Sequence, residues 1–199
     1  MRCVQLCRGR WNTEACRRGR QYVWARPSSA WFAQASRCPF FDLAIDSKLR
    51  GCDLVKIKIG TLVAGPEIRA RSLIIQQKTG RPVQFEITSD TRASLLAWLE
   101  GRSGTVDDFA FPSRVDSLGH LSTRQYARLV DERVSAIGLR REEYGTHSLR
   151  RTKASIIYKA TGNLRAVQIL LGHTKVENTV RYLGVDVEDA LELAEATEV

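Results

Sequence analysis

The most informative part of the sequence is the stretch from residue 146 to residue 182, which contains Thr146-His147-Ser148-Leu149-Arg150-Arg151, then Leu170-Leu171-Gly172-His173, then Thr179-Val180-Arg181-Tyr182. Counted from His147, Arg150 follows after three residues, His173 after 26 and Tyr182 after 35. Positions three apart share one face of a helix, and the start of a helix favours an anion because its N–H groups are free. The first pair therefore suits a phosphate, although each of the four residues alone has an ordinary structural explanation.

Helix start and stop signals lie between these motifs. We expect a helix over about residues 148–160 that is ended by Gly162. Asn163 is expected to cap a second helix, which stops before Gly172. An S/T-x-x-E capping pattern that starts at Thr174 predicts a third helix, which carries the tyrosine.

Upstream, the sequence predicts more helices and one small sheet. Alternating apolar and basic residues predict a strand over residues 55–59. Residues 72–77 and 82–87 are two further strand-like runs, joined by a turn that contains Lys78 and Gly80. Together these runs predict a small three-stranded antiparallel sheet in a mostly helical α+β fold. Helices are expected over residues 41–50, from a cap at Ser89 or Asp90 to Gly101, and from a cap at Ser122 to Gly138.

Length and composition set the class of protein. The 199 residues are 43% hydrophobic and 27% charged, which suffices for one well-packed core. No apolar run is long enough to span a bilayer and the Arg-rich start is unlike a signal peptide, so we expect a cytoplasmic protein without a membrane partner. The five cysteines do not suggest a disulfide framework. Cys3, Cys7 and Cys16 match no metal-ligand spacing and have no histidine nearby, so no zinc site is expected.

The net charge of +9 predicts a polyanionic partner, but it is unevenly distributed. Residues 1–40 hold eight Arg and a single acid and so carry +7, which leaves +2 for the rest of the chain. Two interpretations of these forty residues stay open: a flexible basic arm that contacts phosphates, or a segment that contributes little. From Asp186 to the C-terminus the charge reverses, with six acids and no base.

Taken together, the motifs resemble the tyrosine recombinases, also called the phage integrase family, whose catalytic domain carries H-x-x-R, then G-H, then a nucleophilic tyrosine nine residues later. Arg50 followed by Asp53 resembles the first box of that domain, and Lys78 lies in the hairpin turn where the family places its mobile lysine. The resemblance covers residues 41–199 and implies a mostly helical catalytic domain with a small sheet. It supplies six candidate catalytic residues: Arg50, Lys78, His147, Arg150, His173 and Tyr182.

The resemblance also implies the chemistry. The tyrosine attacks a DNA phosphodiester and forms a 3′-phosphotyrosyl bond, which conserves the energy needed to rejoin the strand. Arg50 and Arg150 present forks of donors to the phosphate oxygens as their charge grows, and His173 adds another donor. His147 is placed to accept the proton of Tyr182, and the hairpin lysine protonates the leaving 5′ oxygen. This chemistry requires no metal and no other cofactor.

The start of the chain departs from the family pattern. Members usually carry a helical core-binding domain before the first box, whereas residues 1–40 are irregular and rich in Arg, Cys and Trp. We therefore expect a truncated or altered N-terminal segment of residues 1–40, without a core-binding domain, followed by a catalytic domain of residues 41–199. Such a protein is either a compact recombinase or a remnant that keeps the residues without the activity.

Other functions stay open beside this one. A type IB topoisomerase uses nearly the same chemistry, although the histidine of H-x-x-R and the short chain favour the recombinase. A DNA-binding protein without catalysis, or a structural role without nucleic acid, would also fit parts of the sequence. The expected partner is double-stranded DNA. In the family a C-terminal helix often docks on a neighbouring protomer, so the amphipathic residues 187–199 imply an oligomer on DNA.

Overall fold

The computed structural model describes residues 38–102, 104–113, 115–116 and 118–184, together with Leu191 and Glu195. Most of the expected N-terminal segment, residues 1–40, therefore lies outside the described residues. The same holds for nearly all of the expected C-terminal helix over residues 187–199. The boundary at residue 41 between an N-terminal segment and a catalytic domain stays a prediction.

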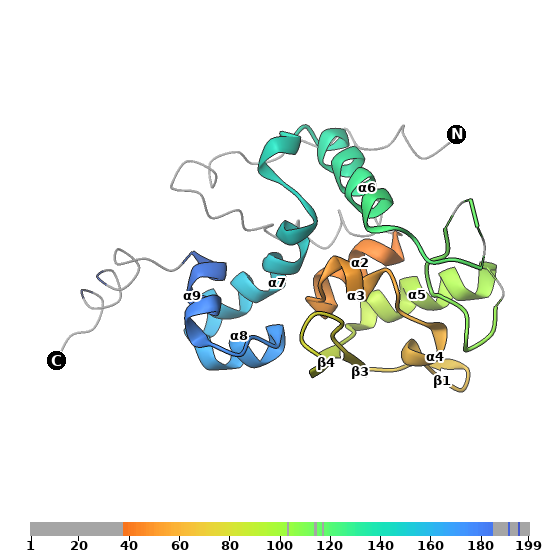
Figure 1. The fold of residues 1–199 in the computed structure, drawn as a ribbon, viewed down its shortest axis with the longest axis horizontal. Coiled ribbons are helices and arrows are strands. Elements are labelled where there is room, and N and C mark those ends of the chain that lie inside the picture. Colours follow the sequence, from red (N-terminus) through yellow and green to blue (C-terminus); the bar gives the residue numbers. More distant parts are fainter. Residues whose placement is uncertain are drawn as a thin grey trace.

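The described part of the chain is mostly helical, with two small hairpins. Figure 1 shows α8 and α9 at one end of the molecule, α4, α5 and the β1–β2 hairpin towards the other, and the β3–β4 hairpin between them. Between them, α2 packs against both α5 and α7. The elements in chain order are α2 (Pro39–Ser47), α3 (Gly51–Leu54), α4 (Ile59–Leu62), β1 (Val63–Ala64), β2 (Glu67–Ile68), β3 (Arg71–Ile75), β4 (Pro82–Glu86), α5 (Ser89–Arg102), α6 (Thr123–Ala136), the 3-10 helix η2 (Arg141–Glu143), α7 (Thr146–Thr161), α8 (Leu164–Leu171) and α9 (Val176–Leu183).

The hairpin around Lys78 is confirmed. Strands β3 and β4 pair antiparallel in a register that sets Ile75 opposite Pro82, and the turn between them contains Lys78. The inward face of the hairpin buries Val83 and Phe85 in β4. The hairpin therefore presents its lysine at the tip of a short, well-anchored ribbon.

The expected strand over residues 55–59 is wrong, and so is the three-stranded sheet. The alternation of buried and exposed side chains is real. Val55, Ile57 and Ile59 are buried, and the two lysines that alternate with them are exposed. The chain nevertheless ends α3 and begins α4 there. Its backbone pairs with a loop: Ala110 donates to the carbonyl of Ile57, and Ile59 to that of Asp108. The two sheets that the structure describes, β1–β2 and β3–β4, have two strands each.

Four of the predicted helix caps are confirmed. Ser122 caps α6 in a reciprocal capping box with Gln125, and the Asn163 side chain accepts from the backbone at the start of α8. Gly162 ends α7 in the left-handed conformation, as Gly172 does for α8. These local signals fix the helices that flank the predicted site.

Other helix boundaries differ from the expectation. The capping pattern of Thr174 and Glu177 does not form, because α9 begins after Lys175 without any side-chain cap. Helix α5 follows Thr88, whose hydroxyl accepts from the backbone of Thr91, so the cap lies before Ser89. Helix α7 begins at residue 146, which places the whole H-x-x-R motif inside its first turns.

Two clusters of buried apolar side chains form the core, and α7 belongs to both. The larger cluster joins α2, the hairpins, α5 and α6, and includes Leu149 of α7. The smaller one is built from Ala154 of α7 with Val167, Leu171 and Leu183 of α8 and α9. Helix α7 therefore fixes α8 and α9 against the rest of the domain.

A cluster of four charges lies between α2, β4 and α7. The ammonium of Lys48, almost fully buried, lies 2.7 Å from Glu86 Oε1 and donates to the carbonyl of Asp46 at 2.6 Å. Lys153 of α7 pairs at 2.8 Å with Asp46 Oδ1 and at 2.8 Å with Glu86 Oε1. Burial alone would raise the pKa of Asp46, but hydrogen bonds from Lys153 and Thr88 outweigh it and hold that pKa below its usual value. Ion pairs between these side chains therefore connect the segment after α2 with β4 and α7.

Several kinds of feature are absent from the part of the chain that the structure describes. None of its helices has both the length and the apolar character needed to cross a membrane. No group of three or more His, Cys, Asp or Glu side chains there could hold a metal ion. Cys38 and Cys52 are free thiols.

We predict that Glu86→Gln lowers the free energy of unfolding by about 2 kcal/mol, because it leaves the buried Lys48 ammonium without its carboxylate partner. Denaturant unfolding of the variant and the wild type measures the change. Glu67→Gln, at an exposed position on β2, is the control and should leave stability within about 0.5 kcal/mol. Equal stabilities of the two variants would contradict a stabilising role for the cluster.

Candidate active site

The carboxyl end of α8 lies at the centre of the predicted site. The helix stops because Gly172 turns into the left-handed region, with φ +66°. The last carbonyls of a helix lack partners within it, and that of Leu171 points at two side chains. It accepts from Arg150 Nη2 at 2.8 Å and from Gln76 Nε2 at 3.3 Å. One backbone oxygen thus holds α7 and the β3–β4 hairpin together.

Gln76 extends this contact to the other predicted arginine. Its side chain is completely buried, and Oε1 accepts from Nη1 of Arg50. Arg50 is extended and directly precedes α3, so its side chain leaves the chain where α2 and α3 are joined. The guanidiniums of Arg50 and Arg150 are therefore both fixed by reference to the same carbonyl of α8.

Tyr182 on α9 lies against the guanidiniums of Arg150 and its neighbour Arg151. The guanidinium carbon of Arg150 is 5.6 Å from the ring centroid, and that of the neighbouring Arg151 is 5.0 Å away. The ring of His173 meets the tyrosine edge-on with centroids 5.4 Å apart. Burial raises the pKa of the Tyr182 hydroxyl, and the nearby guanidiniums offset only part of that rise. The phenol is therefore protonated at neutral pH.

The two predicted histidines both lie beside the tyrosine. The Tyr182 hydroxyl makes a long contact of 3.5 Å with the backbone carbonyl of His147, at the start of α7. His173 follows the end of α8, and its Nδ1 lies 3.1 Å from the hydroxyl of the buried Thr179. The structure thus places the His173 ring and the backbone of His147 next to Tyr182.

Both histidines are uncharged at neutral pH for the same reason. Burial, followed by the charges of Arg150 and Arg50, lowers the pKa of His173 to about 4. Partial burial lowers the pKa of His147 as well, with the neighbouring guanidiniums adding to the effect. A neutral imidazole can accept a proton, or donate through the one ring nitrogen that carries hydrogen.

Two buried N–H groups point to what the site can bind. Four side-chain atoms of the described residues are buried without a hydrogen-bond partner: Asp53 Oδ2 and Nε of Arg92, Arg150 and Arg151. The last two belong to the arginines that contact Tyr182. Unpaired buried donors are rare and costly, so each calls for an acceptor. Phosphate oxygens would accept from several guanidinium N–H groups at once. The arrangement is that of an anion site next to a tyrosine.

Lys78 is the one predicted residue that the structure does not bring into this group. It is exposed at the tip of the β3–β4 turn. The turn is nevertheless tied to the site, because the hydroxyl of Thr79 donates to Gln76 Oε1 at 2.9 Å. The other five predicted residues, Arg50, His147, Arg150, His173 and Tyr182, converge around α8 and α9.

Two residues of the site were not predicted from sequence. Arg151 stands next to Arg150 in the quoted motif, but nothing in the local pattern shows that both face the tyrosine. Gln76 lies inside the strand-like run over residues 72–77 and belongs to no motif. Asp53, the acid of the first box, is buried, and its Oδ1 accepts from the backbone of Gln77 at 2.9 Å, which anchors the hairpin to α3.

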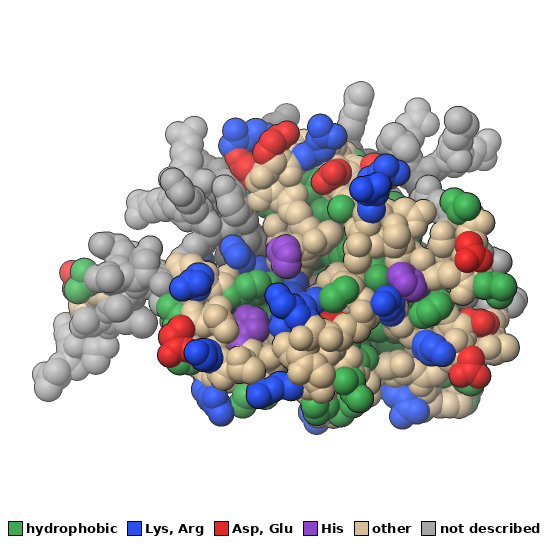
Figure 2. Space-filling model, viewed as in Figure 1, with side chains coloured by type: hydrophobic (Ala, Val, Ile, Leu, Met, Phe, Trp, Pro, Cys, Tyr) green, Lys and Arg blue, Asp and Glu red, His purple; other side chains and the backbone are tan. Residues whose placement is uncertain are grey.

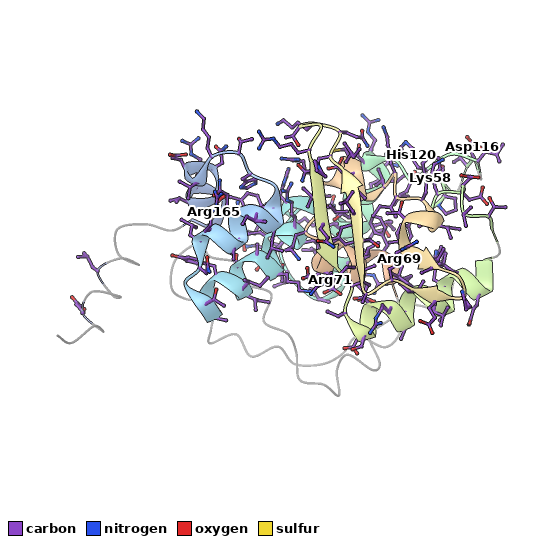
Figure 3. All side chains as sticks on the ribbon, turned by 90° about the horizontal axis from the view of Figure 1, so that it is seen from below. Lys58, Arg69, Arg71, Asp116, His120 and Arg165 are labelled. Carbon is purple, nitrogen blue, oxygen red and sulfur yellow. The ribbon has the colours of Figure 1, made fainter. Side chains whose placement is uncertain are left out.

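Basic side chains surround the site. Figure 2 shows Lys, Arg and His side chains gathered near the middle of one face of the molecule. In Figure 3, Arg165 lies on the side of α7 to α9, and Lys58 and His120 lie on the other side of the β3–β4 hairpin. Basic residues therefore lie on both sides of the hairpin, with Asp116 near those on the far side.

We predict that Gly172→Ala destabilises the protein by about 2 kcal/mol more than Gly162→Ala, because only the first combines a left-handed backbone with a clash. A Cβ at position 172 would meet Val83 Cγ2 at 2.6 Å and Gln76 Nε2 at 3.0 Å. Gly162 is equally left-handed, at φ +62°, but a Cβ there meets nothing within 4 Å. Denaturant unfolding compares the two, and equal losses would show that the close approach is unimportant.

Comparison with known proteins agrees with this geometry. The model of the phage integrase family matches residues 28–189. The tyrosine recombinase XerD of Caulobacter vibrioides is 29% identical over 150 residues, which are 72% of this chain and 48% of that protein. The probable integrase/recombinase YoeC of Bacillus subtilis is 38% identical over 146 residues, 73% of this chain and 76% of that protein.

Solved structures share the fold. The XerA recombinase has a TM-score of 0.64 at 17% identity, covering 88% of this chain and 65% of its own. The XerH site-specific recombinase bound to its difH substrate has a TM-score of 0.63 at 19% identity, with 85% and 48% covered. The predicted mostly helical α+β class is thereby confirmed, apart from the number of strands.

The comparisons extend over most of this chain but only part of several relatives. The chain spans about half the length of the first curated relatives that it matches, 48%, 46% and 45%. The family match itself covers far more than half of this chain. This chain belongs to the phage integrase family, the tyrosine recombinases.

Proposed function

We propose that this protein is a site-specific DNA recombinase that cuts and rejoins DNA through a 3′-phosphotyrosyl intermediate. The observation that carries the proposal is that the guanidiniums of Arg150 and Arg151 and the neutral imidazole of His173 meet on the ring of Tyr182, with unpaired N–H donors buried beside it. A tyrosine surrounded in this way is suited to attack a bound phosphodiester. The reaction needs no metal and no other cofactor, because every group it uses is a side chain of the chain itself.

The cleavage step exchanges one ester bond for another. The Tyr182 hydroxyl oxygen attacks phosphorus, the bond to the 5′ oxygen breaks, and a tyrosyl ester forms to the 3′ phosphate. The phenol proton passes to the His147 ring, which is neutral and so able to accept it. Rejoining is the reverse: a 5′ hydroxyl attacks the tyrosyl ester and the tyrosine leaves with a proton.

The arginines stabilise the charge that develops on the non-bridging oxygens. Arg50 and Arg150 offer planar forks of donors, and their fixed positions avoid the cost of reorganisation during the reaction. His173 adds a neutral donor if its proton lies on Nε2. The hydroxyl of Thr179, 3.1 Å from Nδ1, favours that tautomer when it donates to Nδ1.

Lys78 is proposed to protonate the leaving 5′ oxygen. Its exposed position in the turn leaves the ammonium free to reach a DNA strand laid across the basic face. The turn is linked to Gln76 through Thr79, so the turn that carries Lys78 stays close to Arg50. Lys78 would thus reach the 5′ oxygen from the hairpin turn once DNA is bound.

We further propose that the substrate is double-stranded DNA, that the protein acts in the cytoplasm, and that residues 187–199 dock on a neighbouring protomer. The convergence of five of the six predicted residues argues against an inactive remnant of an integrase. A topoisomerase-like activity would appear as relaxation of supercoiled DNA without any recombination site. The division of the chain at residue 41 belongs to the same proposal.

We predict that Tyr182→Phe abolishes covalent attachment to DNA while leaving DNA binding within a few-fold of wild type, because only the nucleophilic oxygen is removed. A nicked suicide-substrate library, resolved on a denaturing gel, detects the adduct, and a mobility-shift titration measures binding. Tyr158→Phe is the matched control. It changes a partly buried tyrosine on α7 and should form adduct normally. A crosslink that persists in Tyr182→Phe would overturn the assignment of the nucleophile.

We predict that Lys78→Ala slows cleavage about 10²-fold or more and that a 5′-bridging sulfur in the DNA restores the rate. A thiolate leaves without protonation because thiols are far more acidic than alcohols, so a missing acid no longer matters. Single-turnover adduct formation on both substrates measures the effect. Lys56→Ala, at an exposed lysine that contacts the same hairpin, is the control. Slow cleavage of the sulfur substrate by Lys78→Ala would mean that Lys78 does not serve as the acid.

A further inference from the structure

Gln76 is unusual among the polar residues of the hairpin because its side chain is completely buried. It stands one residue after β3, at the start of the turn that carries Lys78. The next residue, Gln77, is exposed. The oxygen and the two N–H groups of a buried amide need hydrogen-bond partners, so the partners it has indicate its role.

The partners of the amide all belong to the active site. Its oxygen accepts from Arg50 Nη1 and from the hydroxyl of Thr79. Its nitrogen donates to the carbonyl of Leu171, which also accepts from Arg150. An amide offers an acceptor and a donor from one planar group, whereas a carboxylate could not donate to Leu171. The residue type is matched to this double task.

The backbone of Gln76 fixes where that amide lies. Its N–H donates to the carbonyl of Arg81 at 2.9 Å, and its own carbonyl accepts from Gly80 at 2.8 Å. These bonds close the turn around Lys78. On the other side, the space beside Gly172 is so tight that a Cβ there would lie 3.0 Å from Gln76 Nε2. The amide is thus held from the hairpin and from α8.

We propose that Gln76 is a positioning residue, whose amide holds the Arg50 guanidinium in line with the carbonyl that fixes Arg150. The inference deepens the proposed function and rests on it. Arg50 is only half-buried and has many rotamers, so without this contact its fork of donors would spread over several positions. Displacement of a catalytic group by about 1 Å can cost about 10²-fold in rate.

A double-mutant cycle tests whether Gln76 acts through Arg50. Gln76→Met keeps the volume of the side chain but removes both hydrogen-bonding groups. We expect Gln76→Met to slow adduct formation on the suicide substrate about 10²-fold, with DNA affinity within a few-fold of wild type. In an Arg50→Ala background the same change should have no further effect, because its target is already gone. An equal loss in both backgrounds, or no loss in either, would overturn the proposal.

Two controls separate positioning from folding. Gln84→Ala changes an exposed amide on β4 of the same hairpin and should leave the rate unchanged. Denaturant unfolding shows whether each variant is folded at the assay temperature, and Gln76→Asn replaces Gln76→Met in the cycle if that variant is not. If Gln76→Met were fully active while cleavage by the wild type depended on Tyr182, this inference would be refuted and the proposed function would stand.

A second measurement does not depend on catalysis. In ¹⁵N NMR spectra of the full chain, a guanidinium held by a hydrogen bond shows slowly rotating Nη–H groups. We expect such signals for Arg50 in the wild type and in Gln84→Ala, and their loss in Gln76→Met. Identical Arg50 signals in Gln76→Met and wild type would overturn the positioning role even if no cleavage substrate were found.

Discussion

The carbonyl oxygen of Leu171 accepts hydrogen bonds from both Arg150 and Gln76, and the arrangement of the site depends on this double contact. The oxygen is free because α8 ends there, and it can be approached from two sides because Gly172 has no Cβ. Through it, α7, the β3–β4 hairpin and the segment before α3 are held at one point. The positions of both guanidiniums therefore follow from how one helix ends.

The buried ion cluster holds the same elements at a second point. Lys48 stands two residues before Arg50, and Lys153 three residues after Arg150, and both lysines pair with Glu86 of β4. Removing four charges from water is costly, so such a cluster is a weak source of net stability. Its strict geometry has another effect, because it leaves α2 and α7 little freedom to slide past one another. The elements that carry the two arginines are thus held in place by the buried ion pairs at one point and by the Leu171 carbonyl at another.

Local signals in the sequence predict the helices well and the long-range contacts poorly. The caps at Ser122 and Asn163 involve residues three apart, so the chain itself shows them. The alternation over residues 55–59 correctly reports burial, but burial alone does not decide between a strand and two short helices paired with a loop. Gln76 contacts Arg50 across 26 residues and Leu171 across 95, and no local pattern contains that information. The six catalytic candidates could be named only because their order and spacing resemble a family.

The charges of the site also explain why its histidines and tyrosine are set for proton transfer. Burial, reinforced by the guanidiniums, lowers the pKa of both histidines and keeps them neutral, and burial keeps the Tyr182 phenol protonated, so the free protein has proton acceptors near a protonated phenol. In the proposed reaction a phosphodiester brings negative charge between Arg50 and Arg150. That charge offsets the part of the lowering of the His147 pKa that the guanidiniums cause, which makes the imidazole a stronger base when substrate is bound. The same anion satisfies the unpaired Nε of Arg150. Activation of the nucleophile is thereby coupled to occupation of the site by DNA.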